Sequence, residues 1–256
     1  MKLGQNEANR QYHIALTPDD VGQYAILPGD PGRVEEIANY LENPVFVAVN
    51  REYKTYAGTL LGRRVCVTST GIGGASAAIA LEELYKCGVR TFIRVGTCGA
   101  IQQEIMPGDV IIAQAAIRAE GTSAEYLPAG YPAAADFAVT DALRRAAVSL
   151  GFTHHVGVVH SKDSFYGQTE PESMPMAEFL QERWSSYIRS GCLASEMEAA
   201  ALFSVGLARR ARVGAVLTAI WNPERHKAGL PQTEYHNNDR AIACTIRAIE
   251  LLINEE

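Results

Sequence analysis

Short apolar runs alternate with amphipathic stretches along most of this chain. Strands are predicted where β-branched, aliphatic and aromatic side chains fill a short run between turn formers, at 25–27, 45–50, 53–60, 65–70, 91–95, 110–117, 156–160 and 213–221. Apolar residues at helical spacing predict helices at 31–41, 77–85, 140–150, 196–210 and 233–254. This alternation predicts an α/β fold with one domain, residues 1–256, and a central twisted mixed, mainly parallel sheet flanked by helices.

The run TFIRVGTCGA, 91–100, places an arginine inside a predicted buried strand. A guanidinium stays charged, so burying Arg94 without a partner anion is costly. The small residues from Gly96 to Gly99 follow at the carboxyl end of the strand, where a ligand approaches the backbone and finds a hydroxyl and free amides. Two explanations fit equally well at this point: a bound oxyanion, phosphate above all, or an internal carboxylate.

The turn PGDPGR, 28–33, joins a predicted strand to a predicted helix and carries a second arginine. Arg33 falls in the first helical turn, where a positive charge opposes the helix dipole and is tolerated best beside an anion. A solvated surface arginine is the plainer alternative. The loop 162–175 is too long and too mixed in polarity for a simple connector, which indicates a ligand lid.

Composition and charge exclude several classes of protein. Of the 256 residues 47% are apolar and 20% charged, as in a globular enzyme, and the formal charge of −6 disfavours a general nucleic-acid surface. No run approaches the roughly 20 apolar residues of a membrane helix, and the first 20 residues lack a signal-peptide core, so we expect a cytoplasmic protein with no membrane partner. The five cysteines are widely spread without a CxxC spacing, which predicts reduced, mostly buried thiols.

Glycine-rich segments give only weak signals when each is taken alone. The segment TGIGGAS, 70–76, resembles a dinucleotide fingerprint, but Ser76 stands where the last glycine would be. The chain contains no GxxxxGK[ST] loop, so the usual nucleotide-triphosphate site is not expected.

Five ordered motifs together are far more specific: LPGDPGR, STGIGG, FIRVGTCGAI, DSFYGQ and SEMEAAA. In this order and spacing they resemble the nucleoside phosphorylase superfamily of hexameric type, and most closely its uridine phosphorylases. The resemblance implies a pentosyltransferase of pyrimidine salvage that converts uridine, with deoxyuridine or thymidine as further substrates, to uracil and ribose 1-phosphate. Inorganic phosphate would be the co-substrate, with no cofactor required. The resemblance also implies a hexamer built from dimers with shared active sites.

The resemblance also implies a role for particular residues. The phosphate site would comprise Gly29, Arg33, Arg94 and Thr97, with Arg51 from the neighbouring subunit. The ribose would be held by Met197 and Glu198, with His13 reaching in from the partner; Arg33, Arg94 and Glu198 would be catalytic. The base would stack on Phe165, be read by Gln168 and be lined by Cys98, Gly99 and Glu196. Glu52, Ile72 and Ser76 match positions where some uridine phosphorylases hold a potassium ion between subunits.

The sequence departs from this family pattern at the base-reading residues. Many uridine phosphorylases carry an arginine two residues after the glutamine, whereas Gln168 is followed by Thr169 and Glu170. A second family arginine directly follows the asparagine at the end of the last strand, but here Arg225 comes three residues after Asn222. Arg225 is therefore the candidate that would swing in to contact the base.

Three other functions remain open from the sequence. Purine nucleoside phosphorylases of this fold use an aspartate near the end of the last strand to protonate the leaving purine, and Pro223 occupies that place, which favours a pyrimidine. A non-catalytic nucleoside-binding protein would explain the missing arginine but not the retained Arg33, Arg94 and Glu198. A hydrolase of related fold would need no phosphate arginines.

Overall fold

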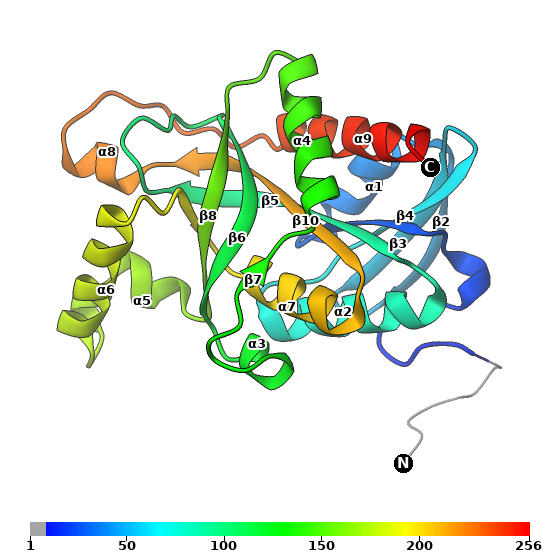
Figure 1. Ribbon diagram of the computed structural model, residues 1–256, viewed down its shortest axis with the longest axis horizontal. Helices are drawn as coiled ribbons and strands as arrows, with labels where there is room; N and C mark the ends of the chain where they lie inside the picture. Colours follow the sequence, from blue (N-terminus) through cyan, green and yellow to red (C-terminus); the bar gives the residue numbers. More distant parts are fainter. Residues whose placement is uncertain (1–8) are drawn as a thin grey trace.

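The computed structural model describes residues 9–256 and shows a 10-stranded mixed sheet covered by helices on both faces (Figure 1). The first part of the polar N-terminal arm, residues 1–8, lies outside the described residues. The mixed α/β architecture predicted from the alternating pattern is confirmed.

The first half of the chain builds one wing of the sheet. β1 (Tyr24–Pro28) pairs in parallel with β4 (Arg63–Thr68) on one side and with β5 (Thr91–Ala100) on the other. β2 (Glu42–Asn50) and β3 (Tyr53–Leu60) continue the wing outward through antiparallel pairing with each other and with β4.

The second half of the chain closes into a ring of strands that includes β5. β10 (Arg212–Trp221) pairs in parallel with β5 and antiparallel with β6 (Val110–Ala119), which pairs in parallel with β8 (His154–Lys162). The short β9 (Ala194–Glu196) joins β8 to β5, and β7 (Ala133–Ala134) pairs with β6 outside the ring. The carboxyl ends of β5, β8 and β10 therefore lie together, with β9 between β8 and β5.

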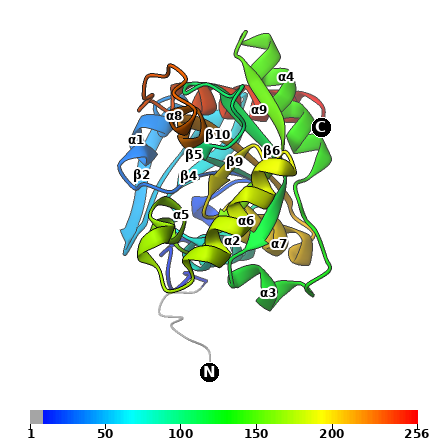
Figure 2. The same ribbon diagram turned by 90° about the vertical axis from the view of Figure 1, so that its left-hand side faces the viewer.

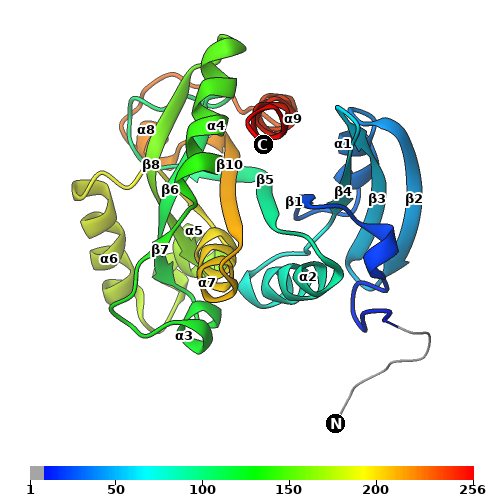
Figure 3. The same cartoon turned by 45° about the vertical axis from the view of Figure 1, so that its right-hand side comes forward.

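Two helical layers enclose two apolar cores (Figure 3). α2 (Gly74–Cys87), α3 (Thr122–Tyr126) and α7 (Ala199–Arg209) cover one face, and α1 (Arg33–Ala38), α4 (Phe137–Ser149) and α9 (Asp239–Asn254) cover the other. Side chains alternate along β5, so Phe92 packs in the core beneath α2 and α7 while Ile93 and Val95 pack in the core beneath α4 and α9. By this alternation Arg94 points to the α2 and α7 side.

Several elements differ from the sequence prediction. β5 continues through its small residues to Ala100 because β9 and β10 pair with that part of the strand. α9 begins at Asp239 rather than at residue 233, and α1 ends at Ala38 rather than near residue 41. The lid region contains α5 (Phe165–Thr169) and the 3₁₀ turn Pro171–Ser173, a second such turn covers Pro18–Asp20, and α8 (Pro223–Lys227) follows β10.

One long helix, α6 (Ala177–Arg189), was not predicted at all. None of its residues is fully buried, but Leu180, Trp184 and Ile188 recur at helical spacing, so an amphipathic pattern was present in the sequence. α5 and α6 lie next to each other on one side of the molecule (Figure 2).

The cysteines and the helices bear on two predictions from the composition, buried thiols and the absence of a membrane helix. All five cysteines are buried and unpaired. Among residues 9–256, no helix combines the length and the apolar character needed to cross a membrane.

Candidate active site

A large pocket opens where the carboxyl ends of β5, β8 and β10 meet. Its volume is about 1460 Å³, enough for a nucleoside together with a phosphate. Twelve of the residues assigned to the site from sequence line it: Gly29, Arg33, Ile72, Arg94, Thr97, Cys98, Gly99, Phe165, Gln168, Glu196, Met197 and Glu198. The roles of these residues remain predictions, but their placement in one pocket is a structural fact.

Arg94 and Glu198 form a buried ion pair at the centre of the pocket. Arg94 Nη2 donates to Glu198 Oε2 at 2.5 Å, and the two side chains are 6% and 4% exposed. Glu198 Oε1 also accepts the backbone N–H of Gly73 at 2.7 Å. Because Glu198 is the N-cap residue of α7 and Gly73 that of α2, this carboxylate joins both helices to the central strand.

The internal carboxylate satisfies only one edge of the Arg94 guanidinium. Arg94 Nε and Nη1 are buried and donate to no atom of residues 9–256. Buried donors without an acceptor are rare in native proteins, and each costs about 1–3 kcal/mol. The structure thus supplies the internal carboxylate, Glu198, and leaves Arg94 Nε and Nη1 without an acceptor among the described residues.

Glycines at two positions make room for this guanidinium. A methyl group on Gly96 would lie 3.1 Å from Arg94 Nη2, and one on Gly29 would lie 3.3 Å from Nη1. Arg33, the first residue of α1, lines the same part of the pocket, and no described residue accepts a hydrogen bond from its side chain. The two arginines, with Thr97 beside them, make a site suited to a small polyvalent anion.

The Glu196 carboxylate is fixed by hydrogen bonds within the protein. Its Oε2 accepts the N–H groups of Glu198 and Ala199 at 2.8 and 2.9 Å, and its Oε1 accepts the Ser161 hydroxyl. Burial, followed by the nearby charge of Glu198, raises the pKa of Glu196, and Arg94 opposes that rise. Glu196 thus shapes the wall of the pocket and fixes the first turn of α7.

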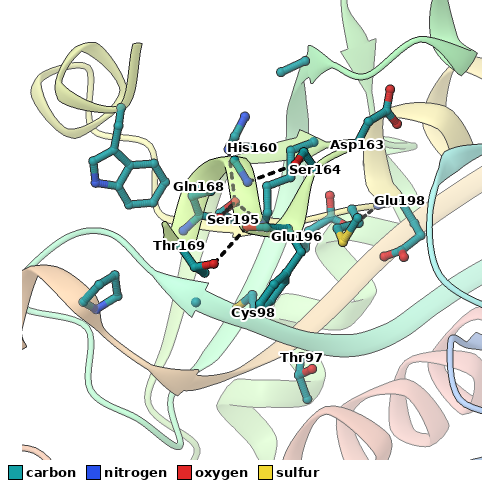
Figure 4. Close-up of a pocket in the computed structure, with 18 of the residues that line it drawn as sticks. Thr97, Cys98, His160, Asp163, Ser164, Gln168, Thr169, Ser195, Glu196 and Glu198 are labelled. Atoms are coloured by element: carbon teal, nitrogen blue, oxygen red, sulfur yellow. Dashed lines mark hydrogen bonds between the residues drawn. The ribbon is translucent and has the colours of Figure 1, made fainter. Parts of the chain in front are cut away.

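The other end of the pocket contains a cluster of polar side chains around Ser195 (Figure 4). The Ser195 hydroxyl lies 2.9 Å from Gln168 Oε1, 2.9 Å from Lys162 Nζ and 3.1 Å from His160 Nδ1. Burial, helped by Lys162 and Arg183, lowers the pKa of His160 to about 3, so the imidazole is neutral near pH 7. Burial also lowers the pKa of Lys162, against the opposing charges of Glu196 and Glu198.

Phe165 and Cys98 complete this end. The Phe165 side chain is 54% exposed, and the Lys162 ammonium lies 5.8 Å from the centroid of its ring. The Ser164 hydroxyl caps α5 by accepting the N–H of Gly167 at 2.9 Å, which fixes Phe165 and Gln168 on one short helix. Burial raises the pKa of the Cys98 thiol, so it is an unreactive wall residue.

Sequence reasoning missed His160, Lys162, Ser195 and the helix that covers them. The available signal was the group of polar side chains at the carboxyl end of β8, directly after its apolar middle, because such strand ends line ligand sites. Trp184 and Tyr187 of α6 pack on the His160 ring, with centroids 6.4 and 4.6 Å away. The Trp184 indole donates to Glu224 of α8 at 2.8 Å, so α6 is tied across the opening.

His13 and Arg51 do not line the pocket of their own chain. His13 Nδ1 lies 2.7 Å from Glu83 Oε1, and the other oxygen of Glu83 accepts the N–H groups of His13 and Ile14 at 2.9 Å each. The Tyr12 ring lies edge-on to the His13 ring. The Arg51 guanidinium lies 5.8 Å from the centroid of the Tyr12 ring. The two residues therefore belong to one surface cluster away from the cavity.

Arg225 does not enter the pocket, contrary to the sequence hypothesis. Its guanidinium donates to the carbonyls of Gln103 and Pro231, at 2.5 and 2.9 Å. Asn222 caps α8 through the N–H groups of Glu224 and Arg225, so the chain turns into a helix directly after β10 and carries Arg225 away. Arg225 is a brace between loops, and the missing base-reading arginine is not replaced by it.

The three residues assigned to a potassium ion lie around Gly71. A methyl group on Gly71 would lie 2.9 Å from Glu52 Cγ and 3.3 Å from Ser76 Oγ, and Ser76 Oγ donates to the carbonyl of Ile72 at 3.2 Å. No cluster of three or more His, Cys, Asp or Glu residues that could hold a metal is found among residues 9–256. A carboxylate, a carbonyl and a hydroxyl on one surface are nonetheless the oxygen ligands that a hard cation accepts.

Known proteins resemble this chain over nearly its whole length. Uridine phosphorylase of Treponema pallidum (strain Nichols) is 50% identical over 246 residues, which cover 96% of this chain and 95% of that protein. Uridine phosphorylase of Thermococcus kodakarensis is 45% identical over 88% of this chain and 82% of its own. A guanosine phosphorylase of Halorubrum lacusprofundi is 38% identical over 95% of this chain and 99% of its own. Residues 23–252 match the family described as the phosphorylase superfamily, and this chain belongs to that family.

Proposed function

We propose that this protein is a uridine phosphorylase, which converts uridine and inorganic phosphate to uracil and ribose 1-phosphate. The observation that carries the proposal is the Arg94 guanidinium, buried beside Arg33 with two donors that no described residue uses. Such donors match the oxygens of a phosphate, which a hydrolase would not need. The relatives named uridine phosphorylase support the same reaction.

The pocket residues can perform this reaction by positioning and charge. Phosphorolysis passes through a ribosyl cation, which a carboxylate beside the sugar stabilises. Glu198 is held by Arg94 and Gly73 and keeps lone pairs for ribose hydroxyls, next to Met197. Arg33 and Arg94 would orient phosphate toward C1′, and alignment of this kind contributes about 7–11 kcal/mol in well-oriented systems.

A purine substrate is the second candidate because one relative is named guanosine phosphorylase. A purine leaves readily when its ring is protonated, which requires an acid near the end of β10. Pro223 lines the pocket at that place and cannot donate a proton. The pocket therefore favours a pyrimidine, which leaves as an anion.

Subunit assembly would complete the site. Arg51 and His13 lie together outside their own pocket, which supports a homo-oligomer, a hexamer built from dimers, in which each cluster reaches a neighbour's phosphate and ribose. Glu83 fixes the His13 ring through Nδ1 and leaves Nε2 free to point outward. We place this assembly in the cytoplasm, where its five thiols would stay reduced.

A potassium ion at the subunit contact is part of the proposal. Glu52, Ile72 and Ser76 would each supply one oxygen, and a partner subunit would supply the same set. Replacing KCl with NaCl at equal ionic strength should then lower the melting temperature of wild type but not of Glu52→Gln. Equal melting temperatures of wild type in the two salts would argue against a potassium site.

The function is tested by a substrate panel. Uridine, deoxyuridine, thymidine, inosine and guanosine are incubated with the purified protein, with and without phosphate, and separated by chromatography. We expect phosphate-dependent release of uracil from uridine. Purine release with inert uridine would make the protein a purine phosphorylase, and no cleavage despite nucleoside binding would make it a binding protein.

A further inference from the structure

The proposed reaction leaves the burial of Lys162 in the pocket unexplained. It ends β8 at 8% exposure, and its ammonium donates to Ser195 Oγ at 2.9 Å. An ammonium has three donors, and among residues 9–256 only this hydroxyl accepts a hydrogen bond from it. Burying such a charge is unfavourable unless its other donors meet an acceptor, and Lys162 lines the cavity that a ligand would fill.

The hydrogen bonds around Ser195 fix what this cluster presents to a ligand. A serine hydroxyl has one proton and two lone pairs, and Lys162 can only donate to it. With the Gln168 carbonyl oxygen facing Ser195, the hydroxyl donates to Gln168 and its second lone pair accepts Nδ1–H of neutral His160. The NH₂ group and the remaining carbonyl lone pair of Gln168 are then left for the ligand, together with two donors of Lys162.

We propose that Lys162 is the cationic base-reading residue of this enzyme, in place of the arginine that the Gln168 loop lacks. The inference rests on the proposed phosphorolysis of uridine. Uracil presents the 2-carbonyl, N3–H and the 4-carbonyl along one edge, so the Gln168 amide serves N3–H and the 2-carbonyl while Lys162 donates to the 4-carbonyl. Ser195 and His160 are positioning residues that hold the Gln168 and Lys162 side chains in this orientation.

The position of the charge also matches the chemistry of the leaving group. A phosphate oxygen forms a bond to C1′ as the C1′–N1 bond breaks, and the electron pair of that bond passes to N1 and is shared with the ring carbonyls. Water then supplies the proton that converts this anion to uracil. A buried cation at a carbonyl is bonded most strongly when the oxygen becomes anionic, so Lys162 lowers the barrier to departure.

The same arrangement excludes cytosine. Cytosine carries an amino group where uracil has a carbonyl, and an ammonium cannot donate to an amino group that itself donates. Lys162 would face these hydrogens without an acceptor in a desolvated site, so cytidine should be rejected. This discrimination requires no residue beyond those already described.

Three proteins test the role of Lys162 in base reading: wild type, Lys162→Met and Lys162→Arg. Methionine keeps most of the side-chain length without the charge, and arginine restores a cation. We expect Lys162→Met to lower kcat/KM for uridine about 10- to 100-fold, the worth of a hydrogen bond to a charged group. The loss should be smaller for 5-fluorouridine, whose base is a more stable anion, and Lys162→Arg should recover part of it. Lys86→Met, an exposed lysine on α2, is the matched control and should behave as wild type.

Uracil affinity, measured by titration calorimetry, makes the test independent of turnover. Lys162→Met should bind uracil at least about tenfold more weakly with its phosphate KM unchanged. Wild type that fails to cleave uridine contradicts the proposed function and leaves the affinity test valid. An unchanged uracil affinity, or an equal loss of turnover for uridine and 5-fluorouridine, overturns the role of Lys162.

Discussion

At the scale of single residues, the site depends on ionisable groups that are buried in pairs. Arg94 and Glu198 neutralise each other in a desolvated place, and Arg94 Nε and Nη1 keep no acceptor among the described residues. A buried ion pair contributes little by itself, but removing one partner leaves the other charge uncompensated. The groups that carry the chemistry are therefore also structural.

Arg94→Ala should lose both activity and stability. It leaves the Glu198 carboxylate buried without its partner, so the free energy of unfolding should fall by about 3–5 kcal/mol. The double variant Arg94→Met with Glu198→Gln removes both charges and should regain most of that loss while remaining inactive. Denaturant unfolding at a fixed protein concentration measures this, and full stability of Arg94→Ala would contradict a strong pair.

His160 should make the protein sensitive to acid. Its pKa is about 3 in the folded protein and about 6.5 when unfolded, so between these values only the unfolded state binds the proton. Stability should therefore fall as the pH drops from about 6.5 to 3, by up to about 1.4 kcal/mol per pH unit. His160→Gln should flatten this slope, whereas the exposed His236→Gln should not; parallel slopes for wild type and His160→Gln would show that the histidine does not contribute.

At the scale of elements, the sequence predicted those whose pattern is local. β5 was predicted from its β-branched run and the helix that became α7 from its small apolar residues, since each carries its own period. α6 was missed although its apolar residues recur at helical spacing, and its contact with Glu224 of α8, 40 residues away, could not be read from the sequence.

In the site too, local patterns could be predicted from the sequence and contacts between distant residues could not. The five motifs predicted which residues meet, because each stands at the end of a strand. The pairing of Arg94 with Glu198 joins residues 104 apart in sequence, and the Ser195 cluster depends on β8 and β9 lying in register. No local pattern encodes such contacts, and Arg225 was misplaced because the cap of α8 was not foreseen.

Trp184 should control how firmly α6 closes the pocket. Trp184→Phe keeps an aromatic ring but removes the N–H that bonds Glu224, a contact of about 1 kcal/mol. Hydrogen exchange should quicken in residues 177–189, and the uridine KM should rise about fivefold. Arg189→Gln on the same helix is the control, and exchange unchanged by Trp184→Phe would mean that the bond to α8 does not hold the helix.

At the scale of the whole molecule, the pocket of one chain lacks two of the residues assigned to phosphate and ribose, His13 and Arg51. If His13 and Arg51 serve a neighbour, each active site takes Arg33 and Arg94 from one subunit and His13 and Arg51 from another. The surface cluster and the pocket would then be two halves of one catalytic unit.

Mixing two inactive proteins should restore activity. In a dimer of His13→Ala with Arg33→Ala, one of the two sites receives both wild-type residues. Random exchange makes half of the dimers mixed, so activity should reach about a quarter of wild type. No recovery, with subunit exchange proven by mass spectrometry, would show that the sites are not shared.

In the proposed reaction a phosphate held by Arg33 and Arg94 is the nucleophile. Phosphorus-31 NMR during uridine turnover tests it most directly, because the signal of inorganic phosphate and that of a ribose 1-phosphate ester are separate. We predict one equivalent of ribose 1-phosphate for each uracil released. Uracil accompanied by free ribose, with the phosphate signal unchanged, would contradict the account.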